Sequence, residues 1–330
     1  MNSGKSTSQG VRRRLALQAG LALALPAWAQ TGAFPSRPLR LVVPFPAGGG
    51  TDTLARTLGE LLGRELGQPV VIENKAGAGT VIGNDAVAKS APDGHTLLIN
   101  TNAFAIVPSL HPRLPYAAES AFTAITLLGR APNVAVVRAD SPILSGADFL
   151  AQARARPGRL SYGSAGNGTS THLSAELLKI TARIFVTHVP YRGATPAITD
   201  LMGGQIDLAF GTLPSVAPFL ASGKLRALAV TSAARSPLLP GVPTFAESGA
   251  KGYDADVWYG LFVAASTPAP IVQQLHAAMQ RVAGHAEFRK RVQSEGLVLS
   301  LETPDDAQAT VRADVARWRR VVQAQSIKAD

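Results

Sequence analysis

The stretch Pro44–Asp52, which reads PFPAGGGTD, stands between an apolar segment and an amphipathic one. Leu39–Phe45 is typical of a buried strand, and Thr51–Leu66 spaces its leucines on one helical face. Glycines let the backbone approach a ligand closely, and the first N–H groups of a helix have no intrahelical partner. Passage from a strand through glycines into a helix therefore predicts an anion site. The alternative is a tight turn in which Thr51 or Asp52 only caps the helix.

A second stretch, Ser161–Leu173 (SYGSAGNGTSTHL), has the same design further along the chain. Small, donor-rich residues again lead from a strand into a helix. Two such loops, one in each lobe of a protein, can hold one anion from both sides at the carboxyl ends of parallel strands. Neither stretch contains Lys or Arg. Backbone N–H groups, rather than a cationic side chain, are therefore expected to provide most of the anion binding.

Apolar segments alternate with helical ones, which predicts an α/β fold with parallel or mixed sheets. The chain of 330 residues exceeds what one hydrophobic core usually serves, so two lobes are expected. The expected strands are Leu39–Phe45, Val70–Glu73, Thr96–Asn100, Asn133–Arg138, Val186–Val189, Ile206–Phe210 and Leu225–Val230. Further helices are expected from a capping box at Ser145–Asp148 and over Pro268–Val282 and Pro304–Gln323, the last two on the flank of the first lobe.

Two segments, Phe122–Leu128 and Asp256–Ala265, are expected to carry the chain from one lobe to the other and back. The first lobe is then discontinuous, with residues 30–127 and 255–330, and the second lobe takes residues 128–254. Two lobes joined in this way would enclose a ligand cleft between them.

The N-terminus has the organisation of a signal peptide over residues 1–29. Three arginines at 12–14 precede the apolar run Leu15–Ala27, which ends in the A-x-A cleavage site Ala27-Trp28-Ala29. Cleavage there would leave Gln30 as the first residue of a periplasmic protein. The arginines also resemble a twin-arginine signal, but Leu15 and Ala16 match that motif loosely, so Sec export is favoured over the twin-arginine route.

The composition excludes several classes of site. The chain has no cysteine, so disulfides, a thiolate nucleophile and Cys-based metal sites are excluded. Removing residues 1–29 lowers the formal charge from +10 to +6, because that segment has four basic residues and no acidic one. The basic residues are dispersed and the aromatic residues sparse, which argues against nucleic-acid binding. The histidines show no ligand-like spacing with carboxylates, so no metal or other cofactor is expected.

Several motifs together resemble one known family. The chain is similar to the periplasmic substrate-binding receptors of tripartite tricarboxylate transporters, the Bug family. The matching motifs are Pro44–Gly49 with Asp52, Val71–Gly79, Pro92–Leu98, Gly163–Leu173, Pro190–Gly193 and Gly203–Asp207.

The resemblance implies a two-lobed periplasmic binding protein of the Venus flytrap type, type II-like, that binds a small di- or tricarboxylate or an acidic amino acid between its lobes. It implies a monomeric receptor, not an enzyme, that delivers the ligand to integral-membrane subunits of a tripartite transporter. By the same resemblance, the ligand contacts fall on Phe45, Ala47, Gly48, Gly49 and Asp52, then on Thr101 and Asn102, and in the second lobe on Ser164, Ala165, Gly168, Thr169 and Asp207.

Four further residues could meet the ligand. Thr51 stands at the expected helix start, and Tyr191 and Arg192 follow the strand Val186–Val189. Tyr191 could instead pack beneath the cleft, and Arg192 could form a salt bridge on its rim. Phe104 departs from the family pattern, since a smaller or polar residue is expected there. Either its ring enters the cleft and favours a compact or partly apolar ligand, or it is buried in the core.

An exported α/β enzyme that binds a nucleotide or a carboxylate substrate is the alternative function. Gly77–Gly83 imitates a dinucleotide fingerprint, but its spacing is G-x-G-x-x-x-G and it follows the second strand rather than the first. A hydrolase would need a nucleophile elbow, and Ser164 lies in GSAG rather than G-x-S-x-G. His172, the histidine that could serve as its base, is expected to have a structural or capping role.

Overall fold

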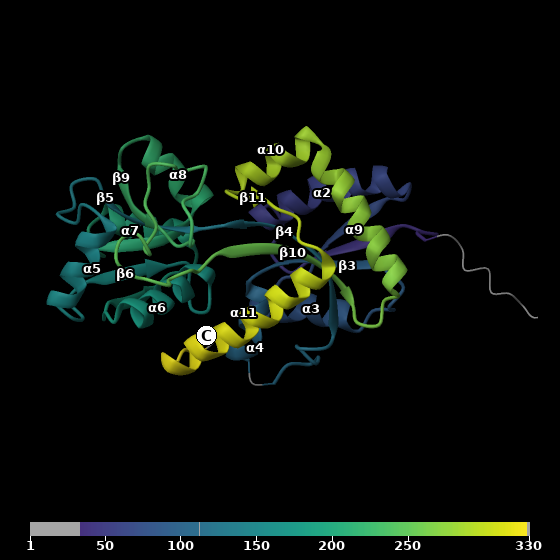
Figure 1. Ribbon diagram of the computed structural model, residues 1–330, viewed down its shortest axis with the longest axis horizontal. Coiled ribbons are helices and arrows are strands. Elements are labelled where there is room, and N and C mark those ends of the chain that lie inside the picture. Colours follow the sequence, from purple (N-terminus) through teal and green to yellow (C-terminus); the bar gives the residue numbers. More distant parts are fainter. Residues whose placement is uncertain (1–33, 112, 329–330) are drawn as a thin grey trace, which may run out of the picture.

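The computed structural model describes residues 34–111 and 113–328, so the predicted signal peptide lies outside the described residues. Two α/β lobes lie beside each other, and two long strands run between them (Figure 1). These strands are Phe122–Ala131 (β4) and Val257–Ala264 (β10), which pair antiparallel. They coincide with the two segments expected to connect the lobes. The lobe boundaries stay a prediction, and the one after residue 127 falls within β4.

The first lobe is built on a mixed sheet, which within the described residues has six strands in the order β11-β4-β10-β3-β1-β2. Besides β4 and β10, it contains Leu39–Val43 (β1), Val70–Asn74 (β2), Thr96–Thr101 (β3) and Val298–Leu299 (β11). β1 pairs in parallel with β2 and β3, whereas β10 is antiparallel to β3 and β11 to β4. The loops that follow β1 and β3 therefore leave the sheet at the same edge.

The second lobe is built on another mixed sheet, in which five strands of the described residues follow the order β7-β6-β8-β5-β9. They are Asn133–Arg138 (β5), Ser161–Ser164 (β6), Thr187–Pro190 (β7), Leu208–Thr212 (β8) and Leu225–Val230 (β9). β6 is parallel to β7 and β8, and β5 is antiparallel to β8 and β9. The carboxyl ends of β6, β7 and β8 therefore share one edge.

Helices cover both sheets. Those of the first lobe are Gly50–Leu66 (α2), Val81–Ala88 (α3), Ala103–Leu110 (α4), Ala269–Gly284 (α9), Ala286–Ser294 (α10) and Pro304–Ala324 (α11), with the short 3-10 helix Ala78–Thr80 before α3. Those of the second lobe are Gly146–Ala155 (α5), Ser170–Ala182 (α6), Ala194–Met202 (α7) and Leu213–Ala221 (α8). None of the helices in residues 34–111 or 113–328 has the length and apolar character needed to cross a bilayer.

Helix α2 packs on the first sheet through the face that its leucine spacing predicts. Leu54, Leu58, Leu61 and Leu62 are all buried in a core shared with β1 and β3. The helix ends at Gly67, whose φ of +70° is the left-handed conformation that glycine adopts without a Cβ penalty. Strong burial of one face fixes the position of the α2 start against the sheet.

The expected capping box forms at the start of α5, but one of its two hydrogen bonds comes from a neighbouring residue. The Asp148 amide donates to Ser145 Oγ at 3.1 Å, as expected for a helix cap. The reciprocal bond to the Asp148 carboxylate comes from the Leu144 amide at 2.9 Å, one residue before the capping serine. These two hydrogen bonds therefore hold the residue before the helix as well as the first turn of α5.

Helix α11 packs on the first lobe and also reaches the second lobe. It lies along α4 and β4 and continues to α6 of the second lobe (Figure 1). Its Asp314 accepts a hydrogen bond from the indole of Trp258 at 2.7 Å, and Arg317 donates to the Asp254 carbonyl at 2.9 Å. α11 is therefore fastened to the segment that enters β10 and contacts both lobes.

Candidate ligand-binding cleft

The first-lobe loop between β1 and α2 is held from inside by Asp52. The Gly48 amide donates to its carboxylate at 2.8 Å, and the side chains of Asn74 and Arg56 donate at 2.9 and 3.0 Å. Burial alone raises the pKa of Asp52, but these hydrogen bonds outweigh burial and lower that pKa below its usual value. The carboxylate therefore stays ionised and fixes the shape of the loop. Its contact with a ligand stays a prediction.

The two glycines before α2 have different roles. Gly48 has a φ of +83°, and a Cβ added there would meet nothing within 4 Å, so the left-handed backbone rather than space requires glycine. Gly49 is the N-cap of α2 and offers no side-chain cap. The alternative in which Thr51 or Asp52 caps the helix is wrong, because both lie inside α2. The first amides of the helix are thus left without a side-chain acceptor at its N-cap.

A cavity of about 670 Å³ lies between the lobes, next to this loop. Gly50, Ala194 and Leu213, which line it, are the first residues of α2, α7 and α8. Its polar lining side chains belong to Thr51, Thr53, Asn133, Thr195, Thr212, Ser215, Tyr259 and Glu295. Both lobes and the connecting strand β10 therefore line one partly open space.

The chemistry of this cavity suits an anion held by neutral donors. The N-caps of the three helices that start there, Gly49, Gly193 and Thr212, make no side-chain cap hydrogen bond. Helix starts carry partial positive charge and amides without intrahelical partners. The described residues that line the cavity include no Lys, Arg or His. Recognition here would rest on backbone amides and hydroxyl groups.

Glu295, which follows α10, is the one acidic side chain among the described lining residues. Its carboxylate lies against Gly50 at the α2 start, where an added Cβ would be 2.2 Å from an oxygen, and it accepts a hydrogen bond from Thr53 Oγ1 at 3.2 Å. Burial, and then the charge of Glu295, raise the pKa of the neighbouring Tyr259 to about 12. The position of this carboxylate beside the helix start could not be predicted from the sequence, because Glu295 is far from Gly50 along the chain.

The second-lobe loop, between β6 and α6, closes on itself. The Ala165 amide donates to Thr171 Oγ1 at 3.0 Å, and the Gly166 amide to Ser164 Oγ at 3.2 Å. The Gly168 amide donates to His172 Nδ1 at 3.0 Å, and the Thr169 amide to the Gly166 carbonyl at 3.3 Å. In this conformation these amides are occupied, which differs from the expectation that they donate to an anion.

The same loop supports the wall of the cavity. The Tyr191 and Gly193 amides donate to the carbonyls of Ser164 and Ala165, each at 3.2 Å, and Gly193 caps α7. Gly168 packs against Leu110 of the first lobe, since an added Cβ would be 2.3 Å from its side chain. The loop therefore joins the α7 start to the opposite lobe.

The remaining predicted first-lobe residues lie beside the cavity rather than in its lining. Thr101 Oγ1 accepts a hydrogen bond from the Ala103 amide at 3.2 Å. Asn102 is buried and is the N-cap residue of α4, but its side chain makes no cap hydrogen bond. Phe45 packs at the margin of the first core, and Ala47 is exposed. Their contact with a ligand stays a prediction.

Tyr191 is partly buried and donates its hydroxyl to Asp200 at 2.8 Å. Burial, and then the Asp200 carboxylate, raise the pKa of Tyr191 to about 12. Arg192 is exposed, and no hydrogen bond or ion pair with another described residue is found for its side chain. The sequence left two positions open for each residue, and the structure places Tyr191 against α7, with its hydroxyl on Asp200, and Arg192 at the surface.

Asp207 needs a correction. It accepts hydrogen bonds from the Ser161 amide and hydroxyl at 2.7 and 2.9 Å, so it sits at the start of β6. Because it precedes β8, which is parallel to β6, it lies at the amino end of these strands. The loop after Ser164 leaves from their carboxyl end. Asp207 is therefore at the opposite edge of the sheet from that loop, and this position does not support the ligand contact that the family resemblance implied for it.

Phe104 is buried, which agrees with the second of the two readings of its ring. It is 5% exposed, stacks on Phe262 at 4.5 Å between ring centroids and meets Phe122 edge-on at 5.0 Å. The ring therefore points into the core beneath α11 and gives no information about the size of the ligand.

Of the predicted residues, Gly48, Gly49 and Thr51 belong to the cavity lining. Sequence reasoning missed the starts of α7 and α8, although each follows a strand of the second sheet as α2 follows β1. The signal was present in Gly193–Thr195 and Thr212–Ser215, where small or hydroxyl residues stand between a strand and a helix.

The features that suggested an enzyme have structural roles. Ser164 Oγ lies 2.7 Å from His188 Nε2, but Ser164 is fully buried and is not in the cavity lining. Gly83 packs against Pro44, where an added Cβ would be 2.6 Å from the proline ring, so close packing accounts for a glycine of the imitated fingerprint. Among residues 34–111 and 113–328, no group of three or more His, Cys, Asp or Glu is placed to hold a metal ion.

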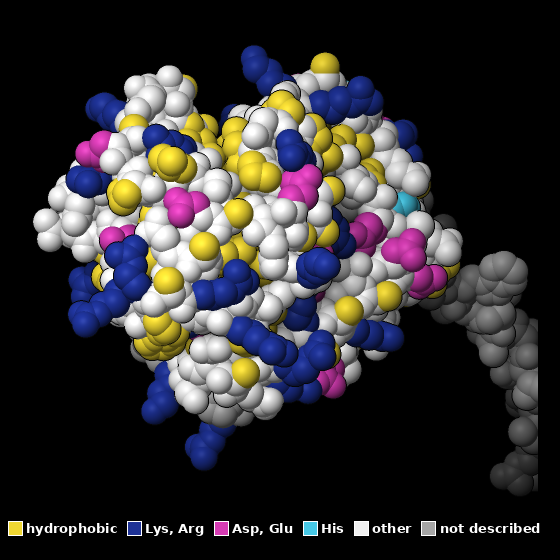
Figure 2. All heavy atoms as spheres, turned by 60° about the vertical axis from the view of Figure 1, so that its left-hand side comes forward, with side chains coloured by type: hydrophobic (Ala, Val, Ile, Leu, Met, Phe, Trp, Pro, Cys, Tyr) yellow, Lys and Arg dark blue, Asp and Glu magenta, His cyan; other side chains and the backbone are white. Residues whose placement is uncertain are grey.

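The surface charge is spread rather than gathered into one stripe. Seen with the second lobe turned forward, Lys and Arg side chains lie over several parts of the face, between apolar and uncharged groups (Figure 2). This distribution agrees with the dispersed basic residues of the sequence.

Comparisons with known proteins agree with this architecture. The family model described as tripartite tricarboxylate transporter family receptor matches residues 54–327. Protein BugT of Bordetella pertussis is 35% identical over 91% of this chain and 92% of its own. The structure of MatC from Rhodopseudomonas palustris with bound malate is 33% identical, with a TM-score of 0.73 over 88% of this chain and all of that one. R. palustris Rpa4515 with adipate is 35% identical, with a TM-score of 0.76 over 89% and 99%.

Proposed function

The chain belongs to the tripartite tricarboxylate transporter receptor family, and we propose that it captures a small di- or tricarboxylate in the cavity between its lobes. The observation that carries the proposal is the meeting of three helix starts around about 670 Å³ of space. This volume lies within the roughly 300–1,000 Å³ typical of small-molecule sites. Malate and adipate, the ligands of the two similar structures, are both dicarboxylates.

The carboxylate would be held by amides and hydroxyls rather than by a salt bridge. The α2 start places the amides of Gly49, Gly50 and Thr51 at the cavity from one lobe, while Thr195 offers a hydroxyl from the other. Hydrogen bonds to a charged group contribute about 1.5–3 kcal/mol each, so several of them can retain an anion without a cation. The second carboxylate of the ligand would reach the opposite wall.

The chain would act as a monomeric periplasmic receptor that needs no cofactor. It would be exported by its N-terminal signal and would deliver the carboxylate to integral-membrane subunits of a tripartite transporter. Support comes from the family and from similar proteins described as periplasmic, such as BugD at 33% identity. The ligand would be released unchanged.

Isothermal titration calorimetry with a panel of C4–C6 dicarboxylates, citrate, aspartate and glutamate tests the proposal. Saturable binding of at least one acid with a stoichiometry of one, and recovery of that acid intact by mass spectrometry, is the expected result. Chemical conversion of the acid, or a response to NAD(H) alone, would favour the exported enzyme instead.

A further inference from the structure

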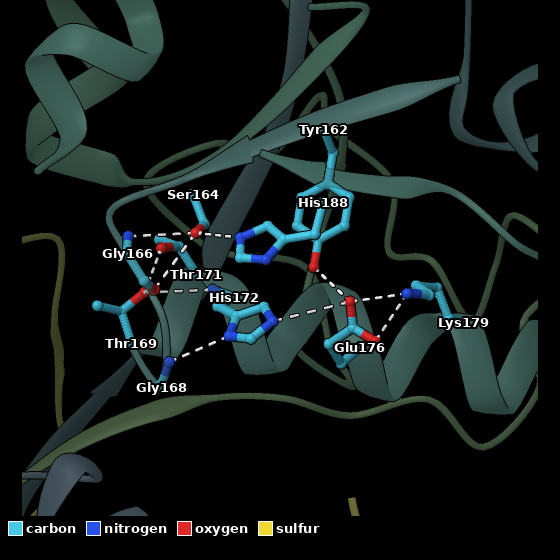
Figure 3. A network of polar contacts seen from close by, with 10 residues as sticks. All are labelled: Tyr162, Ser164, Gly166, Gly168, Thr169, Thr171, His172, Glu176, Lys179 and His188. Carbon is cyan, nitrogen blue, oxygen red and sulfur yellow. Dashed lines mark hydrogen bonds and ion pairs between the residues drawn. The ribbon is translucent and has the colours of Figure 1, made fainter. Parts of the chain in front are cut away.

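A group of buried and partly buried polar side chains lies behind the second-lobe loop (Figure 3). It consists of Tyr162 on β6, His188 on β7, and His172, Glu176 and Lys179 on α6. The two imidazole rings stack at 3.9 Å between centroids and 8° between planes. We call these five residues the histidine network. Nothing in the carboxylate-binding chemistry of the cavity accounts for it.

The position of one proton in this network follows from geometry. The Gly168 amide donates to Nδ1 of His172 at 3.0 Å, so that nitrogen must carry a lone pair. The neutral ring then has its proton on Nε2, which lies 3.8 Å from the Glu176 carboxylate. A doubly protonated ring would direct an N–H group at the Gly168 N–H group. Protonation of His172 is therefore incompatible with this conformation of the loop.

His188 differs from His172 in this respect. Its Nε2 lies 2.7 Å from Ser164 Oγ, and the hydroxyl can donate to that nitrogen or accept from it. The contact therefore survives when His188 gains a proton. His172 thus binds the loop through an acceptor that protonation would remove.

The charged groups around His172 act in opposite directions. Glu176 favours a proton on the ring, but it already accepts from the Tyr162 hydroxyl at 2.5 Å and from Lys179 at 2.8 Å. Burial, and then Glu176, raise the pKa of Tyr162 above its usual value, so that hydroxyl stays a donor. The stacked His188 opposes a second positive charge, as do Lys179 and Lys328, which border the same hollow.

We propose that His172 is a positioning residue for the ligand cleft, and that its neutral form holds the second-lobe loop in the shape that supports the α7 start. The loop transmits this effect through the bond from the Gly193 amide to the Ala165 carbonyl and through the contact of Gly168 with Leu110. Carboxylate affinity should then fall as His172 gains a proton. This inference rests on the proposed function for its effect on affinity.

The tautomer can be measured without any ligand. In a long-range ¹H–¹⁵N NMR spectrum of the full mature chain at pH 8, Nδ1 of His172 should have the shift of a nitrogen without hydrogen, and Nε2 that of an N–H. The Gly168 amide resonance should titrate together with the ring. A proton on Nδ1 at pH 8, or a Gly168 amide that ignores the titration, would overturn the proposal even if no ligand were known.

Two substitutions separate the acceptor from the titrating ring. Asparagine puts an oxygen acceptor close to the position of Nδ1 but does not titrate, and leucine offers no acceptor. At pH 8, His172→Asn should bind the best dicarboxylate about tenfold more tightly than His172→Leu, because only the leucine variant leaves the Gly168 amide unpaired. His276→Asn, which changes a first-lobe histidine bonded to the Ile125 carbonyl, is the matched control.

The pH profile supplies the second readout. Protonation of the ring removes the Nδ1 acceptor, so the wild type and His276→Asn should lose affinity between pH 8 and pH 5.5 more steeply than His172→Asn. Using one ligand for every variant cancels the titration of its carboxylates. Equal slopes for the wild type and His172→Asn, or equal affinity of the Asn and Leu variants, would contradict the proposal. If no carboxylate binds any variant, the proposed function fails, and the NMR result alone decides the role of His172.

Discussion

Asp52 accepts three hydrogen bonds that hold the β1–α2 loop, from the Gly48 amide and the side chains of Asn74 and Arg56. In Asp52→Asn, the amide nitrogen would face one of these donors, so we expect a loss of about 1–3 kcal/mol in the free energy of unfolding at neutral pH. Asp140→Asn, at a site 74% exposed, is the control and should change stability by less than about 0.5 kcal/mol.

The pH dependence of this effect has a definite sign. The folded pKa of Asp52 lies below the unfolded value of about 3.9. Its stabilisation is therefore fully present above that unfolded value and is lost as the pH falls through the folded pKa. Urea unfolding should be measured at pH 7 and at successively lower pH. The difference in the free energy of unfolding between the wild type and Asp52→Asn should become smaller as the pH falls. A gap that stays constant into strong acid would contradict the assigned role.

Glu295 is the second residue with a measurable effect. Its carboxylate borders the α2 start, where it opposes an incoming anion. Glu295→Gln keeps the shape and removes the charge, so dicarboxylate affinity should rise roughly three- to tenfold, most at low salt. Glu287→Gln, on the exposed face of α10, should leave affinity unchanged. Weaker binding by Glu295→Gln in calorimetry would mean that the carboxylate assists the ligand.

Sequence reasoning was most reliable for residues whose role depends on the neighbouring chain. The glycines at 48 and 49 lie in a strand-to-helix loop, as predicted, and they line the cavity. Asp207 was placed at the ligand by resemblance alone, whereas its position before a parallel strand puts it at the other edge. The partners of Asp52 could not be predicted, because Asn74 comes from another strand.

At the scale of helices and strands, periodicity predicted each of the expected strands and the long helices α2, α9 and α11 to within a few residues. These elements have strong apolar patterns that local sequence determines. The starts of α7 and α8 were missed as parts of the cleft, since only the strand order β7-β6-β8 brings them to one edge. The reach of α11 to the second lobe likewise depends on tertiary packing.

The attachment of α11 gives an element-scale prediction. Asp314 is buried and accepts from the Trp258 indole and from Arg317, both of which would lose a partner in Asp314→Ala. We expect a loss of about 3–5 kcal/mol, as for a buried charge left unpaired. Thermal unfolding should show this as a Tm lowered by several degrees. Asp305→Ala, at an exposed position of the same helix, should cost less than about 1 kcal/mol. Equal shifts for both variants would contradict the attachment.

At the scale of the whole molecule, the lobes are joined by β4 and β10 and touch where Gly168 meets Leu110, where Gly296 meets Leu213 and where α11 lies against α6. Lobes linked by a pair of strands usually rotate about those strands. We expect small-angle scattering to give a smaller radius of gyration for the liganded protein than for the free protein. An unchanged radius at saturation would contradict closure of the lobes on the ligand.

The central claim is that backbone amides at the α2 start bind the carboxylate, and two substitutions at Gly49 test it most directly. Its φ of −75° suits proline, and an added Cβ would lie 3.5 Å from its nearest neighbour, an ordinary contact. Gly49→Ala therefore keeps the amide, while Gly49→Pro deletes it at the helix cap.

Calorimetry with the best dicarboxylate should give near wild-type affinity for Gly49→Ala and binding weakened by about tenfold or more for Gly49→Pro. Arg192→Gln, which changes the exposed arginine that follows β7, should lose less than the proline variant. Thermal unfolding of each variant verifies that it is folded. If Gly49→Pro binds as tightly as Gly49→Ala while Arg192→Gln abolishes binding, a cationic side chain holds the ligand and the account of the cleft is wrong.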